Sequence, residues 1–183
     1  VTSDYRILNS LPTLEYLLKQ DCKIVIMSHR GRPEGRPDKQ YSLEPVARRL
    51  AKLINKPVLF VGDCVGPEAD KAKSELKNGQ ILVLENTRFH NEEKANDPAF
   101  GKQLAQGVDI FVQDAFGNAH RKHASTDAVT RHVTSVAGLL LAREVDTITD
   151  VMEKPARPLM AVIGGAKISD KIGVLNRLID IAD

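Results

Sequence analysis

The stretch KIVIMSHRGRP, residues 23–33, changes within a few positions from apolar strand residues to a loop with one histidine and two arginines. Its nearly continuous apolar run predicts a strand that is covered on both faces, as in a parallel sheet. In open α/β sheets, ligands bind beyond the carboxyl ends of the strands. Cations at this position therefore indicate an anion site, although a solvated loop would explain a single segment of this kind.

The same pattern of a short apolar run followed by a helical segment repeats along the chain. Four further strands are predicted at 57–61, 81–85, 109–113 and 159–163, and amphipathic helical segments at 11–20, 42–54, 66–78, 97–107 and 139–158. Alternating strands and helices with short connections predict an α/β fold with a doubly wound, Rossmann-like parallel sheet in three α/β/α layers.

Cations follow four of the five predicted strands. Besides residues 28–33 they occur in NTRFH (86–90), DAFGNAHRKHAS (114–125) and GGAKISDK (164–171), whereas GDCVGPE (62–68) has none. The carboxyl ends of parallel strands meet at one edge, so these side chains are expected to lie together. Arg32, Arg88 and Arg121 offer planar forks for carboxylate or phosphate oxygens, and His29, His120 and His123 add further donors.

Several neighbouring residues have a simpler explanation. Arg36 is typical of a solvated loop, and His90 and His132 of surface or hydrogen-bonded polar positions. For Lys122 and His123, polarity beside a helix stays an equal alternative to ligand binding.

The segment GGAKISDK differs because it follows a strand and opens a helix. Lys167 and Lys171 are four residues apart and share one helical face. A glycine-rich turn at a helix start is suited to phosphate, but the spacing is not that of a Walker A loop. A strand-to-helix turn with solvent-exposed lysines remains the alternative.

Composition restricts the function classes. The 183 residues carry a net charge of +2, with 4% aromatic residues and no tryptophan, which disfavours a general polyanion or nucleic-acid binder. No apolar run approaches the ~20 residues of a membrane span. The two cysteines, Cys22 and Cys64, lie far apart, which favours a reducing, cytoplasmic location. The histidines could suggest zinc, but no short histidine pair has a carboxylate or cysteine that would complete a zinc site.

Together, the motifs SHRGRP, LENTRFH, DAFGNAHRKHAS and GGAKISDKI closely resemble the phosphoglycerate kinase family in its bacterial-like form. The resemblance covers the whole chain, including DYRILNSLPTLEYLL and DCVGPE. It implies a phosphoglycerate-binding domain over 1–141 whose first strand is missing, an interdomain helix over 142–156, and the truncated start of a nucleotide-binding domain over 157–183. Arg30 and Asn118 depart from the family's usual leucine and threonine.

The resemblance also implies an activity and a role for each site residue. The reaction is reversible phosphoryl transfer from 1,3-bisphosphoglycerate to MgADP, which gives 3-phosphoglycerate and MgATP in glycolysis and makes the enzyme a phosphotransferase with a carboxyl acceptor. Arg6 and Lys167 would be catalytic. The substrate would be bound by Arg6, His29, Arg32, Arg88 and Arg121, and the nucleotide by Gly164, Gly165, Lys167 and Lys171. The Mg²⁺ ligands would lie outside this chain, and the enzyme would be a monomer without nucleic-acid or membrane partners.

Two rival hypotheses remain. A non-catalytic α/β module that binds phosphate-rich partners would show affinity that falls steeply with salt. A naturally truncated, regulatory paralogue cannot be separated from an enzyme fragment by sequence. We expect the chain by itself to be inactive as a kinase.

Overall fold

The computed structural model describes residues 3–164 and 172–183. By its internal contacts the chain divides into two compact units, residues 1–141 and 142–183.

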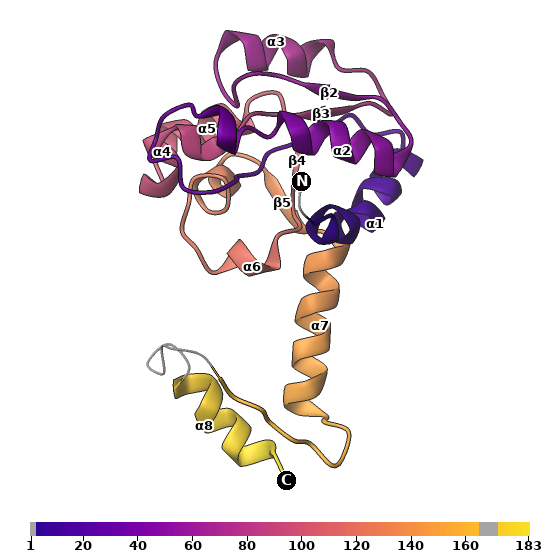
Figure 1. The fold of residues 1–183 in the computed structure, drawn as a ribbon, viewed down its shortest axis with the longest axis vertical. Helices are drawn as coiled ribbons and strands as arrows, with labels where there is room; N and C mark the ends of the chain where they lie inside the picture. Colours follow the sequence, from indigo (N-terminus) through magenta and orange to yellow (C-terminus); the bar gives the residue numbers. More distant parts are fainter. Residues whose placement is uncertain (1–2, 165–171) are drawn as a thin grey trace. The chain divides into compact units, whose positions relative to one another are not determined.

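A three-stranded parallel sheet forms the centre of the first unit (Figure 1). Strands β1 (Ile24–Ile26) and β2 (Val58–Phe60) both pair with β3 (Ile81–Val83), in the order β1-β3-β2. The side chains of β3 are almost completely buried, as expected for a central strand covered on both faces. The parallel sheet predicted from the apolar runs is therefore confirmed.

Helices cover both faces of this sheet. The helices of the first unit are α1 (Tyr5–Lys19), α2 (Glu44–Ile54), α3 (Pro67–Glu75), α4 (Asn91–Ala95), α5 (Pro98–Ala105) and α6 (Phe116–Ala119), with 3₁₀ turns η1 (Lys39–Tyr41), η2 (Thr87–Phe89) and η3 (Ala128–Arg131). Residues of α1 and α2 pack with Ile81 and Val83, whereas α5 and η3 pack with Leu82 and Leu84. Since side chains alternate along a strand, these two cores lie on opposite faces and confirm the three-layer arrangement.

The fourth predicted strand belongs to a separate pair. Strand β4 (Ile110–Gln113) runs parallel to β5 (Thr134–Ala137), with Ile110 opposite Thr134. The prediction of one continuous sheet was therefore wrong. Strand β5 was missed because its sequence, TSVA, is short and all four residues are exposed, which leaves no apolar run to detect.

Helix α1 is longer than its pattern suggested. We expected a helix over 11–20 with Pro12 near its start, but α1 begins at Tyr5 and places Pro12 inside the helix. A proline inside a helix removes one backbone hydrogen bond. The burial of Thr13 and Leu14 and the ion pair between Asp4 and Arg49 of α2 offset that loss.

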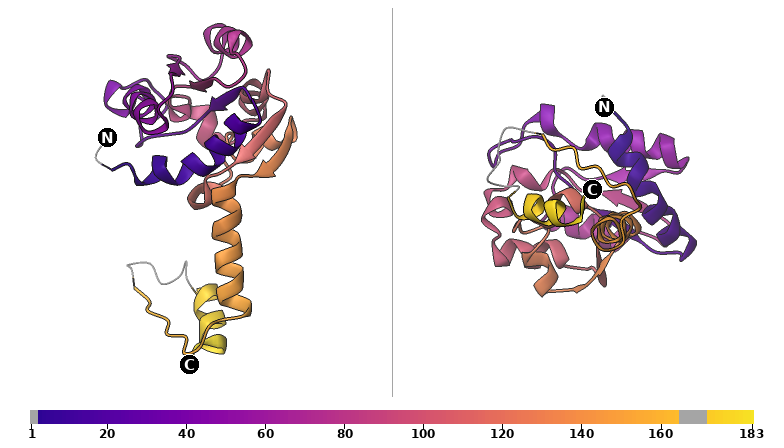
Figure 2. Two further views of the ribbon diagram at one scale, coloured as in Figure 1. Left: turned by 90° about the vertical axis from the view of Figure 1, so that its right-hand side faces the viewer. Right: turned by 90° about the horizontal axis from the view of Figure 1, so that it is seen from below.

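The second unit contains most of α7 (Leu139–Glu153) and all of α8 (Ile172–Ile181), and Figure 2 follows both helices from two further directions. The strand predicted at 159–163 was wrong, because the structure shows no strand over these residues. Met160 and Val162 are 84% and 90% exposed, and no strand is described in this unit with which they pair. No helix in the described part of the chain is long and apolar enough to cross a membrane.

Candidate anion-binding site

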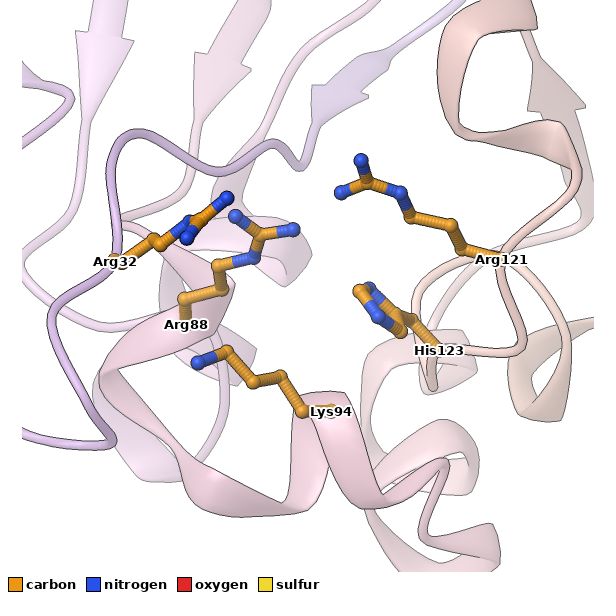
Figure 3. Close-up of a pocket in the computed structure, with 5 residues that line it drawn as sticks. All are labelled: Arg32, Arg88, Lys94, Arg121 and His123. Carbon is orange, nitrogen blue, oxygen red and sulfur yellow. The ribbon is translucent and has the colours of Figure 1, made fainter. Parts of the chain in front are cut away.

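A pocket of ≈ 370 Å³ lies where the loops after β1, β3 and β4 meet. It is lined by Arg32, Arg88, Lys94, Arg121 and His123, and none of these side chains is acidic. Figure 3 shows Arg32 and Arg88 on one side and Arg121 and His123 on the other, and the side chain of Lys94 extends from α4 to a position below Arg88. The fold thus brings together the three arginines that the sequence singled out.

Arg88 is the most firmly held of the five. It lies in η2 directly after β3 and is only 7% exposed. Its Nη1 donates to the carbonyl oxygen of Gly31 at 2.9 Å, and its backbone N–H donates to Oδ1 of Asn86 at 3.1 Å. Its Nε is buried and has no hydrogen-bond partner among the described residues. A buried donor without a partner is costly, so an acceptor on a bound anion would stabilise it.

A buried polar network connects the loop after β3 to the loop after β1. The side-chain amide of Asn86 donates to the carbonyl oxygens of Arg30 and Tyr41 at 2.8 and 3.0 Å. The carboxylate of Glu85 accepts hydrogen bonds from the Ser42 hydroxyl at 2.6 Å and the Asn86 backbone at 2.7 Å. Because each of these groups is paired, the network fixes the loops before any ligand arrives.

Gly31 allows the loop after β1 to turn next to Arg32. Its φ of +66° lies in the left-handed region, and a Cβ there would come within 2.3 Å of the Tyr41 ring. Only glycine fits this position without displacing the ring. The turn also leaves the carbonyl oxygen of Gly31 available to Arg88.

The opposite side of the pocket depends on one buried carboxylate. Glu93 of α4 is completely buried and accepts hydrogen bonds from the Ser125 backbone at 3.0 Å and the Ser125 hydroxyl at 2.6 Å. Its Oε1 also lies 3.8 Å from Nδ1 of His123. The carbonyl oxygen of Arg121 accepts a hydrogen bond from the Thr126 hydroxyl at 2.6 Å. These contacts hold the loop that carries Arg121 and His123.

Burial and the neighbouring cations lower the pKa values of three basic residues at the site. Burial, followed by the charge of Arg121, lowers the pKa of Arg88. Burial also lowers the pKa of His123, and the nearby Glu93 carboxylate opposes that effect. The pKa of His29 falls to about 4, first through burial and then through the charge of Arg88. An anion in the pocket would relieve this mutual repulsion.

The remaining predicted residues are less closely gathered. His29 is half-buried, and Arg6 is exposed near the start of α1; neither lines the pocket, although the charge of Arg6 helps to lower the pKa of His29. His120 is exposed and does not line the pocket. Gly164 is exposed in the second unit. The predicted nucleotide-site residues Gly165, Lys167 and Lys171 lie outside the described residues.

Sequence reasoning missed Lys94 and left His123 undecided. Lys94 lies in NEEKA, where adjacent glutamates made it look like an ordinary surface charge. A usable signal was its position only six residues after Arg88, in the first helix after the loop of β3. Only the folded chain shows that both residues line the pocket.

The fold also brings together Asp63, Cys64 and His90, a set that could hold a metal ion and that short-range spacing did not reveal. Their contacts account for the cluster without a metal. Oδ1 of Asp63 accepts a hydrogen bond from the Cys64 backbone at 2.6 Å and lies 2.7 Å from Nε2 of His90. Burial, with the charges of Asp63 and Glu93, raises the pKa of the Cys64 thiol, and a protonated thiol is a poor metal ligand. His90 is thus a hydrogen-bonded polar residue, as expected.

Fold and site together define a three-layer α/β protein with a cationic pocket at the carboxyl ends of its strands. The family model for phosphoglycerate kinase matches residues 1–183, so the chain belongs to that family.

Individual relatives agree with the family assignment. The chain is 49% identical to phosphoglycerate kinase of Moorella thermoacetica and 52% identical to that of Desulforudis audaxviator, with 100% of the chain and 47% of each relative covered. The solved phosphoglycerate kinase of Coxiella burnetii is similar with a TM-score of 0.84 and 40% identity, over 100% of this chain and 46% of that one. The solved phosphoglycerate kinase of Pyrococcus horikoshii OT3 is similar with a TM-score of 0.86 and 31% identity, over 98% of this chain and 46% of that one. The chain thus spans about half the length of these relatives.

Proposed function

We propose that the pocket binds the phosphate group of 3-phosphoglycerate and 1,3-bisphosphoglycerate. The observation that carries the proposal is a set of five basic side chains, from three loops and one short helix, around one pocket without an acidic residue. A phosphate monoester offers three acceptor oxygens and a charge of roughly −1.5 to −2 at neutral pH. Arginine forks on two sides match both its geometry and its charge.

In the longer protein, this site would serve reversible phosphoryl transfer between 1,3-bisphosphoglycerate and MgADP, with the carboxyl group of 3-phosphoglycerate as acceptor in the reverse direction. Such a transfer needs positioning and charge stabilisation more than covalent help from the protein. Arg32, Arg88 and Arg121, together with His29, would hold the substrate. Arg6 and Lys167 would act on the transferring group, and Gly164, Gly165, Lys167 and Lys171 would contact the nucleotide.

The pocket itself does not suit Mg²⁺. All its lining side chains present nitrogen groups, most of them permanently cationic, whereas Mg²⁺ prefers oxygen ligands. In the proposed reaction the ion would come with the nucleotide phosphates. The residues of the pocket would bind and orient the phosphoglycerate only.

We also propose a monomer that acts in cytoplasmic glycolysis without nucleic-acid or membrane partners. Both cysteines are free, which fits a reducing compartment. The near-neutral net charge of +2 disfavours a broad basic surface for a polyanion.

Titration calorimetry of residues 1–183 with 3-phosphoglycerate tests the proposal, with glycerate as the ligand that lacks only the phosphate. We expect saturable binding of 3-phosphoglycerate and at least tenfold weaker binding of glycerate, because charge-assisted hydrogen bonds contribute about 1.5–3 kcal/mol each. Equal affinity for the two ligands, or binding of neither at millimolar concentration, would refute the proposed phosphate site.

A further inference from the structure

Lys94 occupies a position in the pocket that neither a strand nor a strand-end loop provides. It belongs to α4 and lines the pocket together with Arg88 and Arg121. Figure 3 shows that its side chain extends from α4 to a position below Arg88. A helix thus adds a cation to a pocket whose other basic residues come from the loops after β1, β3 and β4.

Among the described residues, no carboxylate forms an ion pair with Lys94, although two glutamates precede it in the sequence. Glu93 is turned inward and is bonded to Ser125. The charge of Lys94 does reach the pocket, since it contributes to the lowered pKa of His123.

We propose that Lys94 is a further phosphate-binding residue, which contacts an oxygen of the bound phosphate that the arginine forks leave free. The inference rests on the proposed function and adds a residue to that site. A lysine suits this place because its ammonium is a compact charge with three donors on a flexible stem. It can follow the ligand, whereas the buried guanidinium of Arg88 is held by the hydrogen bond from its Nη1 to the carbonyl oxygen of Gly31.

The consequence is a preference for the doubly charged phosphate. Three arginines already exceed the charge of a singly charged carboxylate, and a fourth permanent cation favours a dianion over a monoanion still further. Removal of the Lys94 charge should therefore weaken the binding of 3-phosphoglycerate strongly and the binding of glycerate very little.

The test compares Lys94→Met and Lys94→Arg with Lys102→Met, in residues 1–183, by calorimetry with 3-phosphoglycerate. Lys102 is an exposed lysine of α5 outside the pocket, so it controls for the loss of one positive charge. We expect Lys94→Met to weaken binding about tenfold, equivalent to about 1.4 kcal/mol. Lys94→Arg should restore most of the affinity, and Lys102→Met should change it less than about twofold.

Three outcomes would overturn the inference. Unchanged affinity in Lys94→Met would remove the residue from the site. An equal loss in Lys102→Met would show an effect of overall charge. If the unmodified chain binds no 3-phosphoglycerate, the proposed function fails first, and this inference with it. Should Lys94→Met unfold, Lys94→Gln keeps a polar, similar side chain and must show the same loss.

Discussion

The two sides of the pocket are built in different ways. On one side, Arg88 is 7% exposed and is held by Gly31 and Asn86, which belong to a network buried under the β1 and β3 loops. On the other side, Arg121 is exposed, and its loop is bonded to α4 through Glu93. We call these the sheet side (Arg32 and Arg88) and the loop side (Arg121 and His123).

The difference shows how a cationic site can exist before its ligand. On the sheet side, the carbonyl oxygen of Gly31 and a paired polar network hold the buried guanidinium of Arg88, and its unpaired Nε remains for an acceptor on the anion. On the loop side, the exposed Arg121 needs less support, because water screens its charge. We infer that the sheet side is ready for the anion, whereas the loop side adjusts to it.

The largest effect should come from removing the preorganised arginine. Arg88→Met should weaken 3-phosphoglycerate binding by about 3 kcal/mol, because a desolvated, charge-assisted contact is lost. Arg121→Met should weaken 3-phosphoglycerate binding by only about 1.5 kcal/mol, since the charge of Arg121 is exposed to solvent. Calorimetry on both variants measures the difference, and equal losses would contradict the distinction between the two sides.

The second effect concerns the support of the loop side. Glu93→Gln places an amide donor where Glu93 accepts two hydrogen bonds from Ser125, and it should lower the free energy of unfolding by about 2 kcal/mol. The affinity for 3-phosphoglycerate should also fall, because the loop that carries Arg121 loses its anchor. Denaturant unfolding and calorimetry provide the two measurements.

Glu92→Gln is the matched control, because Glu92 is the exposed neighbour of Glu93 on α4. It should leave both quantities within about 0.5 kcal/mol. If Glu93→Gln changes stability but leaves the affinity intact, Glu93 does not position the site.

The smallest effect is a pH dependence. His29 has a pKa of about 4 in the folded chain and 6.5 ordinarily, because of burial and the charges of Arg88, His123, Arg121 and Arg6. The folded state binds this proton less well, so the stability contributed by neutral His29 is present above pH 6.5 and is lost as the pH falls towards 4. Partial exposure limits the effect to about 1 kcal/mol.

Unfolding of the unmodified chain and of His29→Gln between pH 7 and pH 4.5 measures that contribution. The variant should lose less stability than the unmodified chain over this range. Identical dependence of stability on pH in the two proteins would show that the neighbours of His29 do not lower its pKa. With 3-phosphoglycerate present the dependence should shrink, because the phosphate opposes the surrounding cations.

Much of the sheet side could be predicted from the sequence. Apolar runs before SHRGRP and NTRFH indicate parallel strands, and parallel strands place their ends at one edge. The position of Arg32 and Arg88 follows from these two facts. The loop side was predictable only in part, because the motif after β4 indicates Arg121 but leaves His123 open.

Features that depend on contacts distant in sequence were not predictable. Lys94 and Glu93 look alike in a charged pentapeptide, yet one lines the pocket and the other is completely buried. Strand β5 forms although its sequence has no apolar run. Residues 159–163 have an apolar run but form no strand, and the described part of their unit contains no strand with which they could pair. Pattern alone cannot supply such partners, because strands are stabilised by pairing.

The most direct test of the central claim is a ¹H–¹⁵N NMR titration of residues 1–183 with 3-phosphoglycerate. We expect amide shifts on the sheet side, at Gly31 and Arg88, and on the loop side, at His123 and Ser125, with the same midpoint, because one anion contacts both. The loop-side shifts should be larger, since that side adjusts. Shifts on one side only, or two different midpoints, would contradict a single phosphate site formed by both sides.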